Sequence, residues 1–588
     1  MEEVFLDNSN FANIRKIKKL SYSDLKELSY EIRNFLIQTI SKTGGHIGAN
    51  LGTIEITIAL HKVFNSPHDK IIFDTGHQGY THKIITGRKN KFKYLNKYKK
   101  GFSRFLDRRE SVHDIIDSSH AGTSIAIGSG LALNIKKIKS TRKVITVIGD
   151  GSLVEGIAFE SLNYVSDKKL PLLIVLNDNG YAIDKNVGGI KYMTSGKNWI
   201  QKSKNFFESL GLNYIYEQDG HNIKKLCQKL KKIKKLDRTT IFHIKSTKGN
   251  GLEIAKTHPY KLHFSMPFNP QNGLGISSTL QGKSYASEIA NEIDKYLSYK
   301  KKKDLFVLTP ATPYSNHLQD ILLKYPKNIL DVGMAEQHAA GMAAGIGLGK
   351  NKVVLCYQST FMQRAFDQLF HDIAYMKLPV TIVSSRSGFA GFDSSTHHAL
   401  MDLSYLRIIP NLEVYYPSNL KDCVNKFRER IYKKIKNPLV ILHQYEPVDK
   451  EYEPVDIAND YDFFLKESKK NLIITTGNYI PRAFRINELL NKKSIKISLL
   501  CIKQIKPAST KLKNIIKPYK NISVIEENNL IGGLGSMILD INNSNPIIKK
   551  ILLFGIQDKF IEPGSNLNCS KEANIDPKFI FNKLKNIF

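Results

Sequence analysis

The sequence predicts an α/β fold with three doubly wound domains and mostly parallel sheets. The chain has 588 residues, which is too long for a single hydrophobic core. Short apolar runs end in polar or glycine residues, and segments of helical periodicity alternate with these runs. Continuous apolar runs of this kind are typical of strands that are buried on both faces, as in a parallel sheet.

The first region begins with two predicted helices. Apolar residues recur at helical spacing over 21–39, which opens with the capping-like SYSD, and again over 53–64. Between them lies ISKTGGHIGANLG, at 40–52, which we interpret as a glycine-lined turn that lets the backbone approach a ligand closely. Its histidine, His46, can move protons near neutral pH. A plain loop with a capping histidine is the alternative.

Predicted strands follow in the same region. The apolar runs at 70–77, 143–152 and 170–180 predict strands, and helical periodicity over 156–169 makes the last part a strand, helix, strand unit. Because ligands bind at the carboxyl ends of strands in such sheets, we expect functional residues directly after each run.

The alternation continues in two further regions. Their apolar runs and helical segments lie at 281–294, 304–311, 328–349, 351–388 and 438–443, and then at 471–477, 494–503, 521–535 and 549–560. The polar stretches 263–282 and 443–460 read as linkers. We therefore expect domains at 1–282, 283–455 and 456–588.

The composition limits which classes of partner and which cellular compartment we expect for the protein. The formal net charge of +33 comes mostly from scattered lysines, without the arginine forks or clustered aromatics that nucleic-acid readout favours, so we expect no nucleic-acid partner. A basic nucleic-acid-binding protein stays the alternative that charge alone suggests. No apolar run has the length of a membrane span, so we expect no membrane partner. The five cysteines form no CxxC pair, and the N-terminus has no signal or transit pattern, which together predict a cytoplasmic protein.

Two oxygen-bearing side chains follow neighbouring predicted strands. Asp150 lies in GDGS and Asn179 in VLNDN, and a strand, helix, strand unit brings both to one sheet edge. Magnesium prefers hard oxygen ligands, and the backbone carbonyl of Tyr181 could supply a third. We therefore predict a magnesium site at Asp150, Asn179 and Tyr181.

The spacing of these residues resembles the diphosphate-binding motif of thiamine diphosphate enzymes. Further stretches resemble the 1-deoxy-D-xylulose-5-phosphate synthases over nearly the whole chain, including GGHIGANLGTIEITIALHKVF, GDGSLVEGIAFESLN, DVGMAEQHA, STFMQRAFDQLFHDIAYMKLPV, STHHALMDLSYLRIIPNLEVYYPS and VIEENNLIGGLGS. The resemblance implies three domains of transketolase type, a homodimer, and thiamine diphosphate and magnesium as cofactors. It also implies condensation of pyruvate with D-glyceraldehyde 3-phosphate, giving 1-deoxy-D-xylulose 5-phosphate and carbon dioxide, for isoprenoid, thiamine and pyridoxal synthesis.

The resemblance also assigns residues to roles. Catalytic roles fall on Glu336, which would bond the aminopyrimidine ring of the cofactor, and on His46 and His397. Cofactor contacts fall on His77, Ser119, His120, Ala121, Asp150, Gly151, Ser152, Asn179, Leu252, Glu336 and Phe361. Substrate contacts fall on His46, His263, Gln358, Arg364, Arg386, Asp393, His397 and Tyr445, with the two arginines facing the phosphate.

The place of Glu336 in the chain fits the role that the resemblance implies. This residue follows a short apolar run and enters a helix of small residues, where partial desolvation would raise its pKa and suit it to share a proton. The alternative is that Glu336 has no catalytic role and is simply a carboxylate at a helix start, where the helix dipole stabilises it.

Four positions depart from the family pattern. Tyr445 in VILHQYEP replaces a further phosphate-binding arginine, and Gln358, Ser119 and Leu252 replace a tyrosine, a glycine and an aromatic. Loss of one charge-assisted contact costs roughly 1.5 to 3 kcal/mol. A partly decayed relative with low activity is therefore one alternative, and a transketolase or a 2-oxoacid dehydrogenase component is another.

Overall fold

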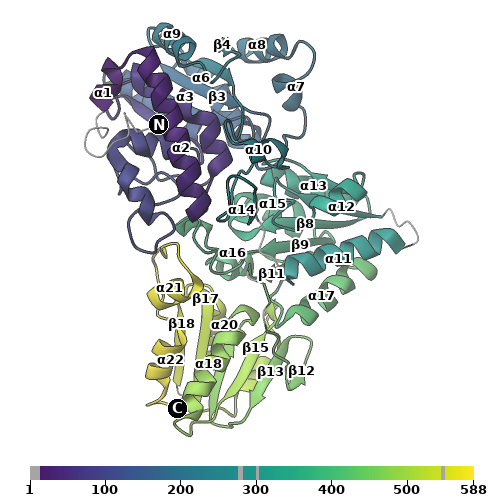
Figure 1. Cartoon of the computed structure of the whole chain (residues 1–588). Helices are drawn as coiled ribbons and strands as arrows, with labels where there is room; N and C mark the ends of the chain where they lie inside the picture. The colour runs from purple at the N-terminus through teal and green to yellow at the C-terminus, as the bar shows by residue number, and fades with distance from the viewer. Residues whose placement is uncertain (1–13, 276–281, 300–303, 446, 449, 544–549) are drawn as a thin grey trace. The chain divides into compact units, whose positions relative to one another are not determined.

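The computed structural model describes residues 14–275, 282–299, 304–445, 447–448, 450–543 and 550–588. They form two compact units: the described residues up to 275, with 333–335, belong to the first, and the other described residues belong to the second. Figure 1 colours the chain from purple at the N-terminus to yellow at the C-terminus. The α/β class with mostly parallel sheets is confirmed, whereas the domain boundaries at 282/283 and 455/456 stay a prediction.

The first unit contains a five-stranded sheet of order β1-β2-β3-β5-β4, in which every pair is parallel. Its strands are β1 (Lys70–Phe73), β2 (Val144–Gly149), β3 (Leu172–Asp178), β4 (Asn213–Glu217) and β5 (Thr240–Lys245). The three strands expected first in the chain are β1, β2 and β3. Their carboxyl ends all lie at one edge, as a parallel sheet requires.

The described helices and short helical turns of the first unit precede, separate or follow these strands in the chain. They are α1 (Ile14–Lys19), α2 (Tyr22–Thr43), α3 (Ile47–Val63), α4 (Tyr80–Lys83), η1 (Ile84–Arg88), η2 (Lys89–Tyr94), α5 (Ser124–Lys137), η3 (Ser152–Val154), α6 (Gly156–Lys168), α7 (Lys191–Thr194), α8 (Trp199–Ser209), α9 (Ile223–Ile233) and α10 (Glu253–Thr257). The stretch SYSD starts α2 as expected, because Ser21 and Asp24 form a reciprocal capping box.

The interpretation of 40–52 as one glycine turn is wrong in extent. The turn consists of Gly44, Gly45 and His46, and α3 begins at Ile47. Gly44 and Gly45 have positive φ values of 73° and 147°, so the turn itself requires glycine. Gly48 is already helical, and a Cβ there would lie 2.0 Å from the carbonyl oxygen of Lys261. That glycine therefore allows a loop to pack against the helix.

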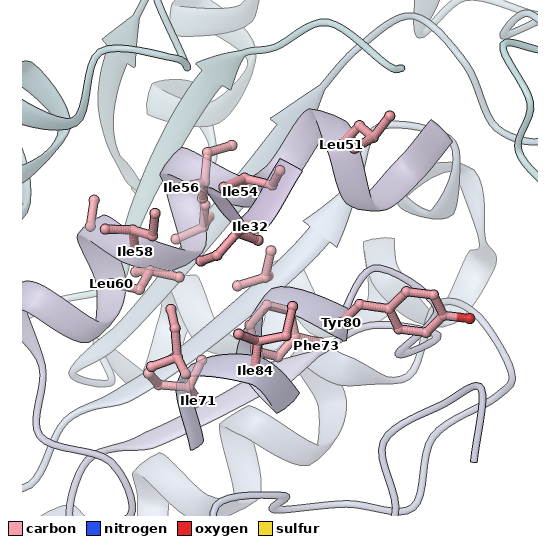
Figure 2. Packing of buried hydrophobic residues seen from close by; sticks show 14 of the residues in the cluster. Ile32, Leu51, Ile54, Ile56, Ile58, Leu60, Ile71, Phe73, Tyr80 and Ile84 are labelled. Atoms are coloured by element: carbon pink, nitrogen blue, oxygen red, sulfur yellow. The ribbon is translucent and has the colours of Figure 1, made fainter. Parts of the chain in front are cut away.

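Two apolar layers cover the faces of the first sheet, which makes the unit doubly wound. One layer joins α2, α3 and α9 to β1 and to alternate residues of β2 and β3. Figure 2 shows part of it, where Ile32 of α2, Ile58 of α3 and Phe73 of β1 belong to one cluster. The other layer joins α5, α6 and α8 to the opposite residues of the same strands. Because α3 is buried on nearly every face, its apolar pattern is not amphipathic.

The second unit contains two sheets. The seven-stranded one has the order β16-β10-β11-β9-β8-β6-β7 and is parallel except for β16. Its strands are β6 (Leu305–Thr309), β7 (Ile329–Asp331), β8 (Lys352–Gln358), β9 (Val380–Ser385), β10 (Glu413–Tyr415), β11 (Leu439–His443) and β16 (Gln504–Lys506). The helical segments among its first six strands are α11 (Tyr285–Ser298), α12 (Gln319–Lys324), α13 (Glu336–Leu348), α14 (Ser359–Met362), η5 (Gln363–Ala365), α15 (Phe366–Gln368), η6 (Leu369–Tyr375), η7 (Ser395–His397), α16 (Asp402–Arg407) and α17 (Leu420–Tyr432).

The six-stranded sheet has the order β12-β13-β15-β14-β17-β18. Its strands are β12 (Asp456–Ile457), β13 (Tyr461–Lys466), β14 (Asn471–Thr475), β15 (Ser498–Ile502), β17 (Asn521–Asn529) and β18 (Lys550–Ile556). The helical segments are η8 (Gly477–Tyr479), α18 (Ile480–Asn491), α19 (Leu512–Ile516), α20 (Leu534–Asn543), α21 (Asn566–Glu572) and α22 (Pro577–Leu584). Strands β12 and β13 pair antiparallel, and the sequence pattern did not predict them.

The described helices include no stretch with the length and hydropathy of a bilayer-spanning segment. The five cysteines are all buried and free of disulfide bonds: Cys227, Cys356, Cys423, Cys501 and Cys569.

The buried His443 makes the free energy of unfolding depend on pH in a predictable direction. His443 ends β11, is buried and stacks on Tyr285 with ring centres 5.6 Å apart. Burial lowers the pKa of His443 to about 4, against about 6.5 in an unfolded chain. Unfolding therefore takes up a proton below about pH 6.5, and this group's contribution to stability is lost as the pH falls from there toward 4.

We expect His443→Phe, which keeps an aromatic ring against Tyr285, to reduce this acid sensitivity. Between about pH 7.5 and pH 5.5, the loss of unfolding free energy should be about 1.4 kcal/mol smaller than in the wild type. Urea unfolding at the two pH values measures the difference. Equal losses in the two proteins would contradict the assignment.

Candidate cofactor and substrate sites

The predicted residues of the first unit gather at the carboxyl edge of its sheet. Asp150 follows β2 and Asn179 follows β3, and these strands are adjacent, with Gly149 opposite Asn177. The backbone N–H of Gly180, the residue after Asn179, donates to Asp150 Oδ2 over 2.8 Å. The structure therefore brings the Asp150 side chain against the 179–181 turn, within which the side-chain Oδ1 of Asn179 accepts the backbone N–H of Tyr181 over 3.1 Å.

The Asp150 carboxyl group is fully buried, and hydrogen-bond donors of the described residues reach only one of its two oxygens. Its Oδ2 also accepts from Asn186 Nδ2 over 2.7 Å, but its Oδ1 has no hydrogen-bond partner among the described residues. Burial, followed by the neighbouring Asp178 carboxylate, raises the pKa of Asp150 to about 8. A buried carboxylate oxygen without a donor fits a cation ligand, so the site suits the magnesium ion that the sequence predicts.

Two residues that the sequence analysis did not assign complete this edge. Lys248, just after β5, is buried and donates from Nζ to the carbonyl oxygens of Ala182 and Ile183 over 2.7 and 3.2 Å. It thereby holds the loop after β3 against the segment that follows β5, while Asn186 donates a hydrogen bond to Asp150 directly. Burial lowers the pKa of Lys248 to about 7. The position of the lysine in STKGNG, directly after an apolar run, was a usable signal.

Three predicted histidines of the first unit lie together. The ring centre of His46 lies 5.6 Å from those of both His77 and His263, which are 5.0 Å from each other. Burial and the charge of Lys248 lower the pKa of His77 to about 3, and the same two causes hold the pKa of His263 well below 6.5. These two rings are therefore neutral at pH 7, each with one nitrogen able to donate and one able to accept.

A fully buried amide holds two of these histidines in place. Asn50 on α3 donates from Nδ2 to the carbonyl oxygens of His46 and His77 over 2.6 and 2.7 Å. Its Oδ1 accepts the backbone N–H of Tyr80 over 2.8 Å. A single side chain thus links the turn before α3 to the loop after β1, a role that no local pattern revealed.

The other predicted cofactor contacts of the first unit lie in loops at the same edge. Ser119, His120 and Ala121 precede α5, in a loop whose Gly122 N–H donates to the buried Asp74 carboxylate over 2.9 Å. Ser152 begins η3, and Gly151 packs so closely on Ala182 that a Cβ would lie 2.5 Å from the Ala182 Cβ. Leu252 is buried at the start of α10.

Glu336 begins α13 in the second unit, as predicted, and is buried. Burial raises its pKa above the ordinary value, and the Arg364 guanidinium, 4.0 Å from Oε2, partly opposes the rise. Oε2 has no hydrogen-bond partner among the described residues. A buried carboxyl group with a raised pKa and an unbonded Oε2 can bond a ring nitrogen and share its proton.

The remaining predicted residues of the second unit lie near the carboxyl ends of β8, β9 and β11. Phe361 meets His397 edge to face at 5.6 Å between ring centres, and Ser394 Oγ lies 2.7 Å from His397 Nδ1. Gln358 is buried at the end of β8, opposite Ser385 of β9. Two other predicted residues lie beside Arg386: the Asp393 carboxylate is 3.3 Å from Nη1, and the ring of Tyr445 stacks on the guanidinium.

Comparisons with known proteins cover nearly the whole chain. The family model for 1-deoxy-D-xylulose-5-phosphate synthase matches residues 9–203 and 191–246. The models for the transketolase pyrimidine-binding and C-terminal domains match residues 286–446 and 464–580.

Curated relatives agree with these matches. The 1-deoxy-D-xylulose-5-phosphate synthase of Alkaliphilus oremlandii is 35% identical over 98% of this chain and 98% of its own length. The synthase of Clostridium acetobutylicum is 35% identical over 95% of each chain. A transketolase structure from Campylobacter jejuni, 15% identical, covers 96% of this chain and 100% of that one with a TM-score of 0.45, which is too low to add to the argument.

Proposed function

Since this chain belongs to the 1-deoxy-D-xylulose-5-phosphate synthase family, we propose that it catalyses the decarboxylative condensation of pyruvate with D-glyceraldehyde 3-phosphate. The products are 1-deoxy-D-xylulose 5-phosphate and carbon dioxide, and the pathway served is non-mevalonate isoprenoid synthesis. The observation that carries this proposal is the 35% identity to a named synthase over 98% of both chains.

We propose that the first unit holds the diphosphate end of thiamine diphosphate through magnesium. When bound, this cofactor supplies the nucleophilic carbon and the electron sink that decarboxylation needs. The free Oδ1 of Asp150, the amide of Asn179 and the carbonyl of Tyr181 would be the protein ligands of the metal. Asn186 and Lys248 would hold the Asp150 carboxylate and the loop after β3 in place.

We assign to Glu336 the proton shared with the aminopyrimidine ring, on which Phe361 would stack. The buried carboxyl group with its raised pKa and free Oε2 supports this role. The cofactor contacts proposed for His77, Ser119, His120, Ala121, Gly151, Ser152 and Leu252 come from the family resemblance, and their positions in the loops of the first sheet edge support them.

The substrate contacts divide by chemistry. His46, His263 and His397 can bond substrate oxygens and transfer protons, and the neutral ring of His263 is able to do either. Arg364 and Arg386 are the cations for an anionic acceptor, with Asp393 and Gln358 as polar neighbours. Tyr445 lies beside Arg386.

We further propose that the chain acts as a homodimer in the cytoplasm. An exposed apolar segment that runs from α15 through η6 to its C-cap supports self-association: Phe366, Phe370, Tyr375 and Met376 are 36%, 41%, 71% and 43% exposed. Aromatic residues and methionine are enriched in protein interfaces. Sedimentation of the purified protein tests this proposal. The domain limits 1–282, 283–455 and 456–588 are likewise our proposal.

The function is tested by product analysis with pyruvate labelled at carbons 2 and 3. With D-glyceraldehyde 3-phosphate, thiamine diphosphate and magnesium, we expect a five-carbon deoxy sugar phosphate that carries both labels. Omitting thiamine diphosphate should abolish the product. Transfer only from a ketose phosphate donor, with no use of pyruvate, would show a transketolase instead.

A further inference from the structure

Arg386 occupies a constrained position at the end of β9. Its φ of 67° lies in the left-handed region, which a residue with a long side chain rarely adopts. The next residue, Ser387, donates its backbone N–H to the carbonyl oxygen of His443 at the end of β11. This pairing sets the Arg386 side chain beside the segment that leaves β11. Backbone strain of this kind is characteristic of functional sites.

The guanidinium of Arg386 is held on two sides. Its central carbon lies 3.9 Å from the ring centre of Tyr445, two residues beyond β11, and Nη1 lies 3.3 Å from Asp393 Oδ2. The side chain is only 14% exposed, and its buried Nε has no hydrogen-bond partner among the described residues. The guanidinium is therefore stacked on Tyr445 and paired with Asp393, while its Nε–H can still donate a hydrogen bond to a ligand.

The aromatic ring cannot bind an anion through its face, because that face carries negative charge. The ring face can act on an anionic ligand by way of the guanidinium, which it attracts by a cation–π contact, whereas the phenol hydroxyl is a separate donor that Tyr445→Phe removes. A long, flexible arginine loses conformational freedom when it grips a ligand, and holding it beforehand reduces that cost. The stacked ring can therefore contribute to anion binding by holding the Arg386 guanidinium in a fixed orientation.

We propose that Tyr445 is a positioning residue that orients Arg386 for the phosphate of the acceptor aldehyde, and so sets the preference for a phosphorylated over an unphosphorylated acceptor. This inference rests on the proposed function, in which Arg386 binds the acceptor. At position 445 the acceptor site then has an aromatic ring that orients Arg386, which is paired with Asp393, and no further cation.

The test compares D-glyceraldehyde 3-phosphate with D-glyceraldehyde at saturating pyruvate. Tyr445→Ala should raise KM for the phosphorylated aldehyde about three- to tenfold, with kcat and the KM for D-glyceraldehyde unchanged. Tyr445→Phe keeps the ring face and should stay within about twofold of the wild type. Tyr30→Ala is the matched control, because Tyr30 also lies by a cation, Lys26, but on the exposed side of α2.

A double-mutant cycle shows whether Tyr445 acts through Arg386. Arg386→Ala should itself raise KM for the phosphorylated aldehyde, and Tyr445→Ala should add nothing in that background. If Tyr445→Ala weakens both aldehydes equally, or weakens binding as much without Arg386, the proposal is overturned. If Arg386→Ala changes neither aldehyde, the assignment of Arg386 to the acceptor fails and the proposal fails with it.

A binding measurement separates this inference from the proposed function. Calorimetry with glycerol 3-phosphate and with glycerol needs no turnover. If the wild type makes no product, the function fails, yet selective loss of glycerol 3-phosphate binding in Tyr445→Ala supports the orienting role. Unchanged glycerol 3-phosphate binding in that variant overturns it.

Discussion

Replacing Glu336 with glutamine is expected to lower kcat about 10²- to 10⁴-fold, the range that a positioned general acid or base supplies. Glutamine keeps the shape of the side chain but can neither take up nor release a proton. Glu336 is buried, its pKa is raised by burial, and Oε2 has no hydrogen-bond partner among the described residues. The group is therefore poised to share a proton.

The measurement is single-turnover and steady-state formation of 1-deoxy-D-xylulose 5-phosphate, beside equilibrium binding of thiamine diphosphate with magnesium. Binding should weaken by less than about tenfold, since one hydrogen bond is altered. Glu429→Gln, which changes a half-exposed carboxylate on α17, is the matched control and should keep full activity. A Glu336→Gln enzyme with wild-type kcat would remove Glu336 from the mechanism.

Replacing Asp150 with alanine is expected to weaken magnesium-dependent binding of thiamine diphosphate by at least about 100-fold, because loss of an outer partner alone costs 10- to 100-fold in metal affinity. Asp150 contributes the only charge among the three proposed ligands. The oxygen available for the metal is Oδ1, since Oδ2 is occupied by the N–H of Gly180 and the amide of Asn186.

A graded series makes this prediction specific. Asn186→Ala removes one bond to Asp150 Oδ2 and should weaken metal-dependent binding about tenfold. Asp150→Asn should impair binding as strongly as alanine does, yet the metal-free variant should melt no lower than the wild type, because an ionised carboxylate is costly at a fully buried site. Calorimetric titration of magnesium and thermal melting of the metal-free proteins measure the two effects. Normal metal-dependent binding by Asp150→Ala would contradict the proposed ligand set.

The site residues differ in how visible they were in the sequence. Asp150 and Asn179 each follow an apolar run that forms a buried parallel strand, so their meeting at one edge followed from strand order alone. Glu336 follows a short strand and starts a helix, and both features are local. Asn50 and Asn186 gave no such signal, because each acts through bonds to segments that only the folded chain brings near.

The glycine-rich stretch at 40–52 shows a limit of local patterns. A turn and a closely packed helix both require glycine, the first for backbone angles and the second for space. Only the carbonyl of Lys261, which a Cβ at Gly48 would strike, distinguishes the two uses. The antiparallel strand β16 was equally hidden, since its partner β10 lies far earlier in the chain.

By itself the sequence determined the α/β class and most of the buried parallel strands, though not β4, β5 or β10, because burial pattern is a property of short segments. The tertiary structure alone decided which side chains touch. Tyr445 looked like a lost cation in the sequence, and its stacking on Arg386 became visible only because β9 and β11 are neighbours in the sheet. Such adjacency depends on how distant strands pair, a long-range choice that no local spacing records.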